Sequence, residues 1–91
     1  MVKRADGTLE LEIMQILWDS PSPISPSQVR EQLSGNLAYT SVATVLMRLC
    51  DKKQLSRSIV GRSYVYSPKI SREEWYSRRM NAILNEATNH R

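Results

Sequence analysis

The 91-residue sequence has little of the material from which disulfide frameworks, membrane spans and catalytic centres are built. It contains one cysteine, one histidine and no phenylalanine, and its uninterrupted apolar runs are only a few residues long. The lone Cys50 excludes an intramolecular disulfide and is typical of a reducing cytosol. The apolar runs are too short to cross a membrane, and the first seven residues lack the apolar segment of a secretory signal. We therefore expect a small cytoplasmic domain with one modest core.

Residues that carry catalytic or metal chemistry are equally scarce. His90 stands one residue from the C-terminus, where fraying disfavours a positioned general base. Cys50 cannot hold a metal ion without ligands from another chain, and no P-loop, HExxH, CxxC or nucleophile elbow is present. Two pairs of glutamates fall in the first turns of predicted helices, where capping and the helix dipole account for them. These pairs are Glu10 with Glu12 and Glu73 with Glu74. The sequence indicates neither an enzyme nor a resident metal or cofactor.

What the sequence does have is positive charge in one place. The net charge is +4, and the segment from Gln54 to Arg72 contains cations but no acid. Its four cations are Arg57, Arg62, Lys69 and Arg72. Residues 1–53 carry six charges of each sign, and residues 73–91 carry three of each. A neutral body with its whole excess on one segment is typical of a surface that contacts a polyanion. Charge alone leaves open the alternative of a basic segment that is merely solvated.

Two helices are predicted in the first third of the chain. Residues 8–19 place apolar side chains at helical spacing, namely Leu9, Ile13, Met14, Ile16, Leu17 and Trp18. Two prolines end this helix and keep residues 20–25 extended. The sequence Ser25-Pro26-Ser27-Gln28 is a capping-box signature with proline in the first helical position. A short second helix follows, and Gly35 stops it.

A third helix, a hairpin and a fourth helix are predicted next. The third helix covers residues 40–52, and its inward face consists of Val42, Val45, Leu46 and Leu49. Leu55–Val60 and Ser63–Tyr66 read as two strands joined by a turn at Gly61-Arg62. A second capping-box pattern at residues 71–74 begins the fourth helix.

This order of elements predicts a mainly α fold with a small β-hairpin, the winged helix-turn-helix. The order is helix, short strand, helix, helix, hairpin wing and C-terminal helix. Residues 1–70 form the expected winged-helix DNA-binding domain. Residues 71–91 form the C-terminal helix and the start of a candidate dimerisation region.

The outer face of the third helix has the short side chains that a helix needs to meet the floor of the DNA major groove. These candidates are Thr40, Ser41, Ala43 and Thr44. The methyl groups of Ala43 and Thr44 suit a thymine methyl, and the hydroxyls of Thr40 and Ser41 suit phosphates or base edges. Arg48, one turn further on, has the reach for a guanine or a phosphate. An ordinary surface helix is the alternative, although better helix formers usually fill exposed positions.

The hairpin carries two further candidates, Arg57 and Arg62. Both suit a phosphate or minor-groove contact by a wing. Both equally suit the role of charged edge residues that prevent further strand pairing. Tyr64 and Tyr66 share one strand face, and we expect them in the core rather than as stacking platforms.

The fourth helix carries an apolar stripe with two candidate uses. The stripe consists of Tyr76, Met80, Ile83, Leu84 and Ala87, with Trp75 at its flank. It either pairs with a second copy of the chain or packs on its own domain, and the sequence leaves both open.

Four segments, in this order and spacing, resemble the penicillinase-repressor family, which includes β-lactamase, methicillin-resistance and copper-responsive repressors. They are LELEIMQILW at 9–18, VREQL at 29–33, LAYTSVATVLMRLCDKKQL at 37–55 and GRSYVYSP at 61–68. The resemblance covers about residues 8–78. It implies a bacterial transcriptional repressor that binds a palindromic operator in double-stranded DNA as a homodimer. It also implies that the third-helix candidates face DNA and that Arg62 is the wing contact.

Two departures from the family limit what the resemblance implies. Family members usually continue into a longer helical dimerisation region, so we expect either an isolated DNA-binding domain or a naturally short member. For an isolated domain the dimer would be weak or absent, because one amphipathic helix buries little area. The cleavage region of the β-lactam branch and the paired cysteines of the copper branch have no counterpart here, so no inducing signal is implied.

The alternative function is a winged-helix protein-interaction module without specific DNA binding. In that case the third helix docks on a protein and the wing merely solubilises the domain. A steep loss of duplex affinity with rising salt separates the two functions, since phosphate contacts release counterions.

Overall fold

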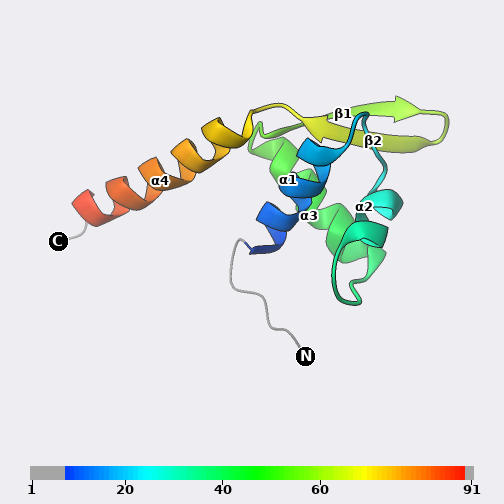
Figure 1. Cartoon of the computed structure of the whole chain (residues 1–91), viewed down its shortest axis with the longest axis horizontal. Helices are drawn as coiled ribbons and strands as arrows, with labels where there is room; N and C mark the ends of the chain where they lie inside the picture. The colour runs from blue at the N-terminus through cyan, green and yellow to red at the C-terminus, as the bar shows by residue number, and fades with distance from the viewer. Residues whose placement is uncertain (1–7, 90–91) are drawn as a thin grey trace.

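Residues 8–89 form four helices and a two-stranded hairpin in a computed structural model of the chain, with side chains described as far as residue 84. The elements are α1 (Thr8–Asp19), α2 (Pro26–Gln32), α3 (Tyr39–Asp51), β1 (Leu55–Val60), β2 (Ser63–Pro68) and α4 (Arg72–Asn89). In Figure 1, α1, α2 and α3 lie together beside the hairpin, while the hairpin tip and α4 point to opposite sides. This is the predicted winged helix-turn-helix. None of the described helices is long and apolar enough to cross a membrane.

The helix-turn-helix begins at the capping box that the sequence predicts. Ser25 Oγ accepts a hydrogen bond from the Gln28 backbone N–H at 3.3 Å, and the Gln28 side chain accepts one from the Ser25 N–H at 2.9 Å. At the other end of α2, Arg30 Nε donates to the Leu37 carbonyl oxygen at 2.7 Å. The two capping bonds satisfy donors that the start of α2 leaves unpaired. The Arg30 bond holds the loop that leads into α3 against α2.

One apolar core lies between the first three helices and the base of the hairpin. The predicted inward face of α3 is confirmed, since its four members are at most 7% exposed. The other elements and the segments between them contribute Ile13, Met14, Leu17, Ile24, Val29, Leu33, Leu55, Tyr66, Ile70 and Trp75. Burial of each such side chain contributes roughly 1.5–3 kcal/mol. The core thus fixes which face of α3 is left for solvent or a ligand.

The hairpin is antiparallel, with Gly61 and its neighbour in the turn. β2 runs two residues beyond its predicted end at Tyr66, because Leu55 at the start of β1 pairs with Pro68. Gly61 has a φ of +63°, a conformation that glycine adopts without the penalty of a Cβ atom. The turn therefore forms where the sequence predicts it.

The short strand of the expected fold is a single bridge between Ile24 and Tyr66. The two residues exchange backbone hydrogen bonds of 2.8 and 3.1 Å. Since Ile24 lies between α1 and α2, this bridge attaches the base of the hairpin to the helix-turn-helix.

The start of α4 is anchored on α1. Trp75 is 1% exposed and meets Trp18 edge-on, with ring centroids 6.0 Å apart and ring planes at 81°. Trp18 Nε1 donates to the Ile70 carbonyl oxygen at 3.0 Å, and Arg72 pairs with Asp19 at 3.3 Å. The prediction that Trp75 flanks the exposed stripe of α4 is therefore wrong. The chain returns from the hairpin to α1 at Ile70, and this return places Trp75 in the core.

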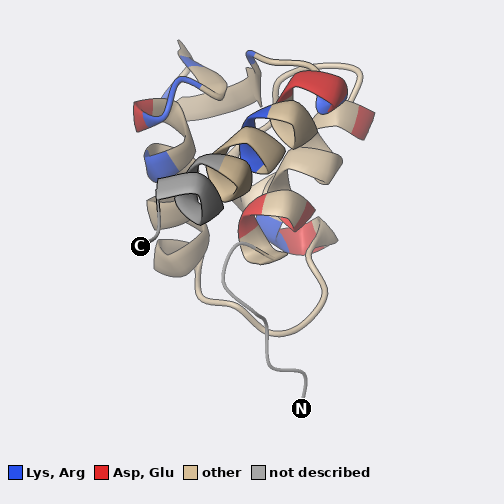
Figure 2. Cartoon of the chain, turned by 90° about the vertical axis from the view of Figure 1, so that its left-hand side faces the viewer, with Lys and Arg blue, Asp and Glu red and all other residues tan. Residues whose placement is uncertain are grey.

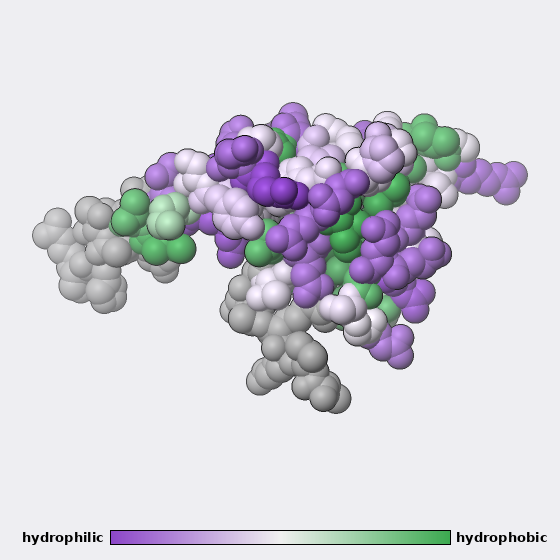
Figure 3. Space-filling view, in the orientation of Figure 1, coloured by the Kyte–Doolittle hydropathy of each residue, from purple (hydrophilic) through white to green (hydrophobic). Residues whose placement is uncertain are grey.

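Beyond that anchor, the apolar stripe of α4 is exposed. The exposed fractions are 47% for Tyr76, 58% for Met80, 59% for Ile83 and 55% for Leu84. Figure 3 shows the apolar patch on the projecting part of α4. These four described members therefore do not pack into the core of their own domain, contrary to one of the two alternatives. The side chain of Ala87, and all of His90, lie outside the described part of the chain.

Candidate nucleic-acid interface

α3 presents a row of short side chains to solvent. Thr40, Ser41 and Thr44 are exposed, and Ala43 is half-buried. Thr44 Oγ1 donates to the Thr40 carbonyl oxygen at 2.8 Å, so its hydroxyl proton is engaged within the helix. The methyl group and the oxygen lone pairs of Thr44 stay available to a ligand. Ala38 is the N-cap and offers no side-chain cap, which leaves the first N–H groups of α3 to water or an anion.

A hollow of about 390 Å³ joins α3 to the hairpin. Three predicted DNA-binding residues line it, one from α3 and two from the hairpin: Ala43, Arg57 and Arg62. The rest of its lining is Ser25, Pro26, Ser27, Tyr39, Met47, Ser63, Tyr64 and Tyr66. The other predicted residues, Thr40, Ser41, Thr44 and Arg48, lie outside this lining. The structure therefore brings the start of α2, one side of α3 and the hairpin arginines around a single concave surface.

Met47 connects α3 to the hairpin at this surface. Arg57 Nη1 donates to Met47 Sδ at 2.9 Å, and the Tyr66 hydroxyl donates to the same sulfur at 3.8 Å. Burial raises the pKa of Tyr66 above its ordinary value of 10.0, and the hydrogen-bonded Arg57 guanidinium opposes this rise. The Tyr66 hydroxyl therefore remains a donor at neutral pH.

Tyr64 is not a core residue, contrary to the prediction. It is 45% exposed, and the guanidinium carbon of Arg57 lies 4.4 Å from its ring centroid. Only the base of the hairpin reaches the core, through Leu55 and Tyr66. Tyr64 pairs instead with Ile59, which is 64% exposed, nearer the projecting tip. Its ring thus supports Arg57 by a cation–π contact at the hollow.

The tip of the hairpin carries Arg62, which makes no ion pair within residues 8–84. The hairpin itself contains no acidic residue, whereas acids and bases both occur on the helices (Figure 2). Its positive charge is therefore not neutralised within the hairpin. Arg72, by contrast, faces Asp19 and is partly neutralised.

Arg48 lies on the side of α3 that faces α1, and its Nη1 is 3.9 Å from Glu10 Oε2. Glu10 is 8% exposed, so capping and the helix dipole do not fully account for it as predicted. Lys52 Nζ lies 3.2 Å and Arg79 Nη1 3.9 Å from its carboxylate oxygens. Glu10 shares a helical spacing of three, four and seven residues with buried Ile13, Met14 and Leu17. That spacing was the signal that could have revealed its burial.

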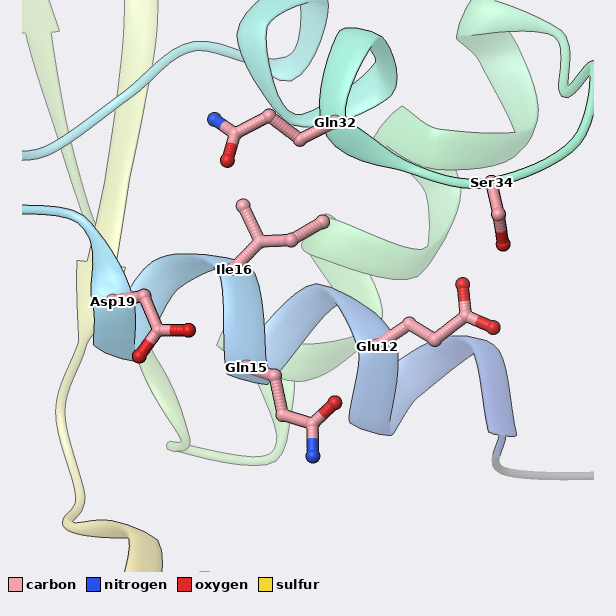
Figure 4. Close-up of a pocket in the computed structure, with 6 residues that line it drawn as sticks. All are labelled: Glu12, Gln15, Ile16, Asp19, Gln32 and Ser34. Atoms are coloured by element: carbon pink, nitrogen blue, oxygen red, sulfur yellow. The ribbon is translucent and has the colours of Figure 1, made fainter.

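A second hollow, of about 330 Å³, lies between α1 and the end of α2. Figure 4 shows its lining, which is Glu12, Gln15, Ile16, Asp19, Gln32 and Ser34. Its two carboxylates would repel a polyanion, so this surface does not suit nucleic acid. Among the described residues, no three His, Cys, Asp or Glu side chains gather in a way that could hold a metal ion.

Comparison with known proteins shows the family to which the sequence belongs. Residues 7–91 match the family model described as penicillinase repressor. The chain belongs to the penicillinase repressor family. The "Transcriptional regulator BlaI" proteins of two Mycobacterium tuberculosis strains, CDC 1551 / Oshkosh and ATCC 25618 / H37Rv, are each 37% identical to it over 83 residues. These matches cover 89% of this chain and 60% of each relative, so the chain spans about 60% of their length.

Membership of the penicillinase repressor family confirms the resemblance that the four sequence segments indicate. In this member of the penicillinase repressor family, the sequence did not reveal Tyr39 and Met47 as residues of the hollow. Both belong to α3 and are 45% and 41% exposed. Met47 is an apolar side chain on the solvent side of an amphipathic helix, and that position could have indicated a contact surface.

Proposed function

We infer that this chain is a sequence-specific, double-stranded DNA-binding transcriptional repressor. The observation that carries the inference is the single concave surface on which α3 and the acid-free hairpin meet. A helix with short outer side chains fits the major groove, and an adjacent wing with unneutralised arginines fits the sugar-phosphate backbone. The name of its relatives, transcriptional regulator, agrees with this role.

The proposed interface extends from the hollow onto the rest of the outer face of α3, and its α3 residues and hairpin arginines have different tasks. Thr40, Ser41, Ala43 and Thr44 meet base edges and adjacent phosphates, and Arg48 reaches a base from the edge of the same face. Arg57 and Arg62 contact the phosphate backbone, which determines affinity and register but carries little sequence information.

The proposal includes a homodimer on a palindromic operator. Residues 1–70 act as the DNA-binding unit and residues 71–91 as the start of the dimerisation region. The stripe of Tyr76, Met80, Ile83, Leu84 and Ala87 pairs with its copy on a second chain. The exposure of its four described members supports this, since monomeric soluble proteins rarely expose a contiguous apolar patch that has no partner. A two-fold axis between the chains gives each head one half-site.

Two arginine variants test the DNA proposal. Arg48→Ala should lower the preference for a specific duplex by roughly 5- to 100-fold, because a base contact is lost. Arg62→Ala should weaken specific and non-specific binding about equally and reduce the salt slope by about 1, because a phosphate contact is lost. Fluorescence anisotropy would compare a duplex selected by the wild-type chain from a random pool with a scrambled duplex.

Arg78→Ala is the matched control, because it removes the same charge from α4, where Arg78 pairs with Glu74. Arg78→Ala should lower the preference for the specific duplex less than Arg48→Ala does. It should also reduce the salt slope less than Arg62→Ala does. If neither Arg48→Ala nor Arg62→Ala alters binding to any duplex, the groove assignment is wrong. Salt-insensitive binding to a protein partner would instead support the interaction module.

A further inference from the structure

Glu10 is the one buried acidic side chain among the described residues, and it is surrounded by cations from two other helices. Its side chain is 11% exposed, whereas those of Arg48, Lys52 and Arg79 are 55%, 47% and 45% exposed. A buried carboxylate needs partners, and these three cations supply them. The cluster therefore joins α1 to the end of α3 and to α4.

The three cations are held in different ways. Lys52 Nζ is within hydrogen-bond distance of both Glu10 oxygens, at 3.2 and 3.4 Å. Arg48 Nη1 and Arg79 Nη1 each stand 3.9 Å from one oxygen, beyond hydrogen-bond distance. Lys52 thus satisfies the carboxylate directly. Arg48 is attracted by its charge but keeps all its hydrogen-bond donors for another ligand.

We propose that Glu10 is a positioning residue for DNA reading, which acts by orienting Arg48 at the edge of the α3 face. This inference rests on the proposed DNA-binding function. A long arginine side chain loses rotamer freedom when it binds a base, and a nearby carboxylate removes part of that freedom beforehand. The Glu10 charge also offsets part of the positive charge of Arg48, Lys52 and Arg79, so a phosphate is attracted less strongly here than it would be without Glu10, which favours a base edge as the partner of Arg48.

Glu10→Gln tests the proposal because it keeps the shape of the side chain and removes the charge. The preference for the selected duplex over the scrambled duplex should fall about three- to tenfold, a fraction of what a whole base contact provides. Affinity for the scrambled duplex should rise, and its salt slope should steepen by about 0.9, as Arg48 becomes a phosphate contact. A residue with a merely structural role would not move the salt slope in this direction.

Glu12→Gln is the matched control. It changes the net charge by the same amount two residues away, on the hollow between α1 and α2. It should leave the preference for the selected duplex unchanged. In an Arg48→Ala background, Glu10→Gln should no longer alter the preference, because the residue through which it acts is gone.

Circular dichroism would establish that each variant is folded before binding is measured. If Glu10→Gln does not fold, Glu10→Asp retains the charge but withdraws the carboxylate by one methylene. That variant should lose part of the preference without gaining affinity for the scrambled duplex. Equal preferences for Glu10→Gln and Glu12→Gln, or an effect of Glu10→Gln that persists without Arg48, would overturn the inference. A wild-type chain that does not distinguish the two duplexes would overturn the proposed function instead.

Discussion

The arginines of the proposed interface differ in how far they are restrained before any ligand arrives. Arg57 is held by the Met47 sulfur and the Tyr64 ring, and Arg48 faces the Glu10 carboxylate. Each restraint removes part of the conformational entropy that a long side chain loses on binding. Arg62 has no hydrogen-bonded or ionic partner among residues 8–84. Restraint suits Arg48 to the defined geometry of a base contact and Arg57 to a phosphate at one fixed position, whereas Arg62 suits a phosphate in several geometries.

The free energy of unfolding should fall at alkaline pH through Cys50 and Tyr66. Burial raises the pKa of both groups above their ordinary values of 9.0 and 10.0; at Cys50 the Arg57 charge opposes the rise and Asp51 adds to it. The folded state then binds each proton more tightly than the unfolded state. Stability is therefore constant below the ordinary pKa and falls as the pH rises through the folded pKa. The decline should begin above pH 9.0 and deepen above pH 10.0.

Urea unfolding between pH 8 and pH 11, followed by tryptophan fluorescence, would measure this decline. Cys50→Ala should remove its first part, and Tyr66→Phe should reduce the part at higher pH. Tyr76→Phe changes an exposed tyrosine in the same way and serves as the control. A Tyr66→Phe curve that follows the wild type at the highest pH would show that Tyr66 is not responsible.

At the scale of elements, the stability of α2 depends on interactions at its two ends. It has seven residues, fewer than an isolated helix needs to be stable in water. Its capping box, its contribution to the core through Val29, and the bond from Arg30 to the loop hold it in place. Since α2 precedes α3 in the helix-turn-helix, its position sets the entry of α3 into any groove.

Ser25→Ala should lower the free energy of unfolding by about 1 kcal/mol, because it removes the side-chain acceptor of the α2 capping box. Thermal or urea unfolding would measure the change. Ser27→Ala is the control, because Ser27 is exposed within the helix and alanine is a better helix former. Ser27→Ala should be neutral or slightly stabilising. Equal losses in both variants would mean that the cap does not stabilise α2.

Local signals in the sequence predicted the helices and strands. The environments of some side chains could not be predicted, because they depend on contacts between residues far apart in the sequence. The capping box at Ser25 and the spacing of Val42, Val45 and Leu46 depend only on near neighbours, and both predictions are confirmed. The position of Tyr64 depends on how far the hairpin projects, which no local pattern encodes. Likewise, the partners of Glu10 come from residues about 40 or more positions away. The short residues of α3 and the wing arginines were predicted as candidates, and their contacts with DNA remain a prediction.

At the scale of the whole molecule, the hairpin part of the proposed DNA interface lies away from α4, whereas Arg48 lies near α4 in the Glu10 cluster with Arg79. The hairpin tip projects to one side of the three-helix body and α4 to the other (Figure 1). The described part of the chain measures about 50 Å along its longest axis and 20 Å along its shortest. A second copy can therefore pair with α4 without covering the hollow between α3 and the hairpin. The distance between two such heads would set the half-site spacing of the operator.

Ile83→Asp should abolish self-association through α4. A charge in the middle of an apolar contact is left without a partner, so the variant should sediment as a monomer. The wild-type chain should show a concentration-dependent mass above that of a monomer, although the dimer should be weak, because one helix stripe buries little area. Sedimentation equilibrium over a wide range of concentrations would measure both. On a palindromic duplex, the variant should also lose the cooperative filling of the two half-sites.

Ile59→Asp is the matched control for this prediction. Ile59 is 64% exposed, against 59% for Ile83, but it lies in the hairpin at the opposite side of the molecule. Ile59→Asp should therefore show the same concentration-dependent mass in sedimentation as the wild type. If Ile59→Asp disrupts association and Ile83→Asp does not, the copies pair through the hairpin. If all three chains remain monomers at the highest concentration, α4 alone does not form the dimer, and each head would then bind its half-site independently.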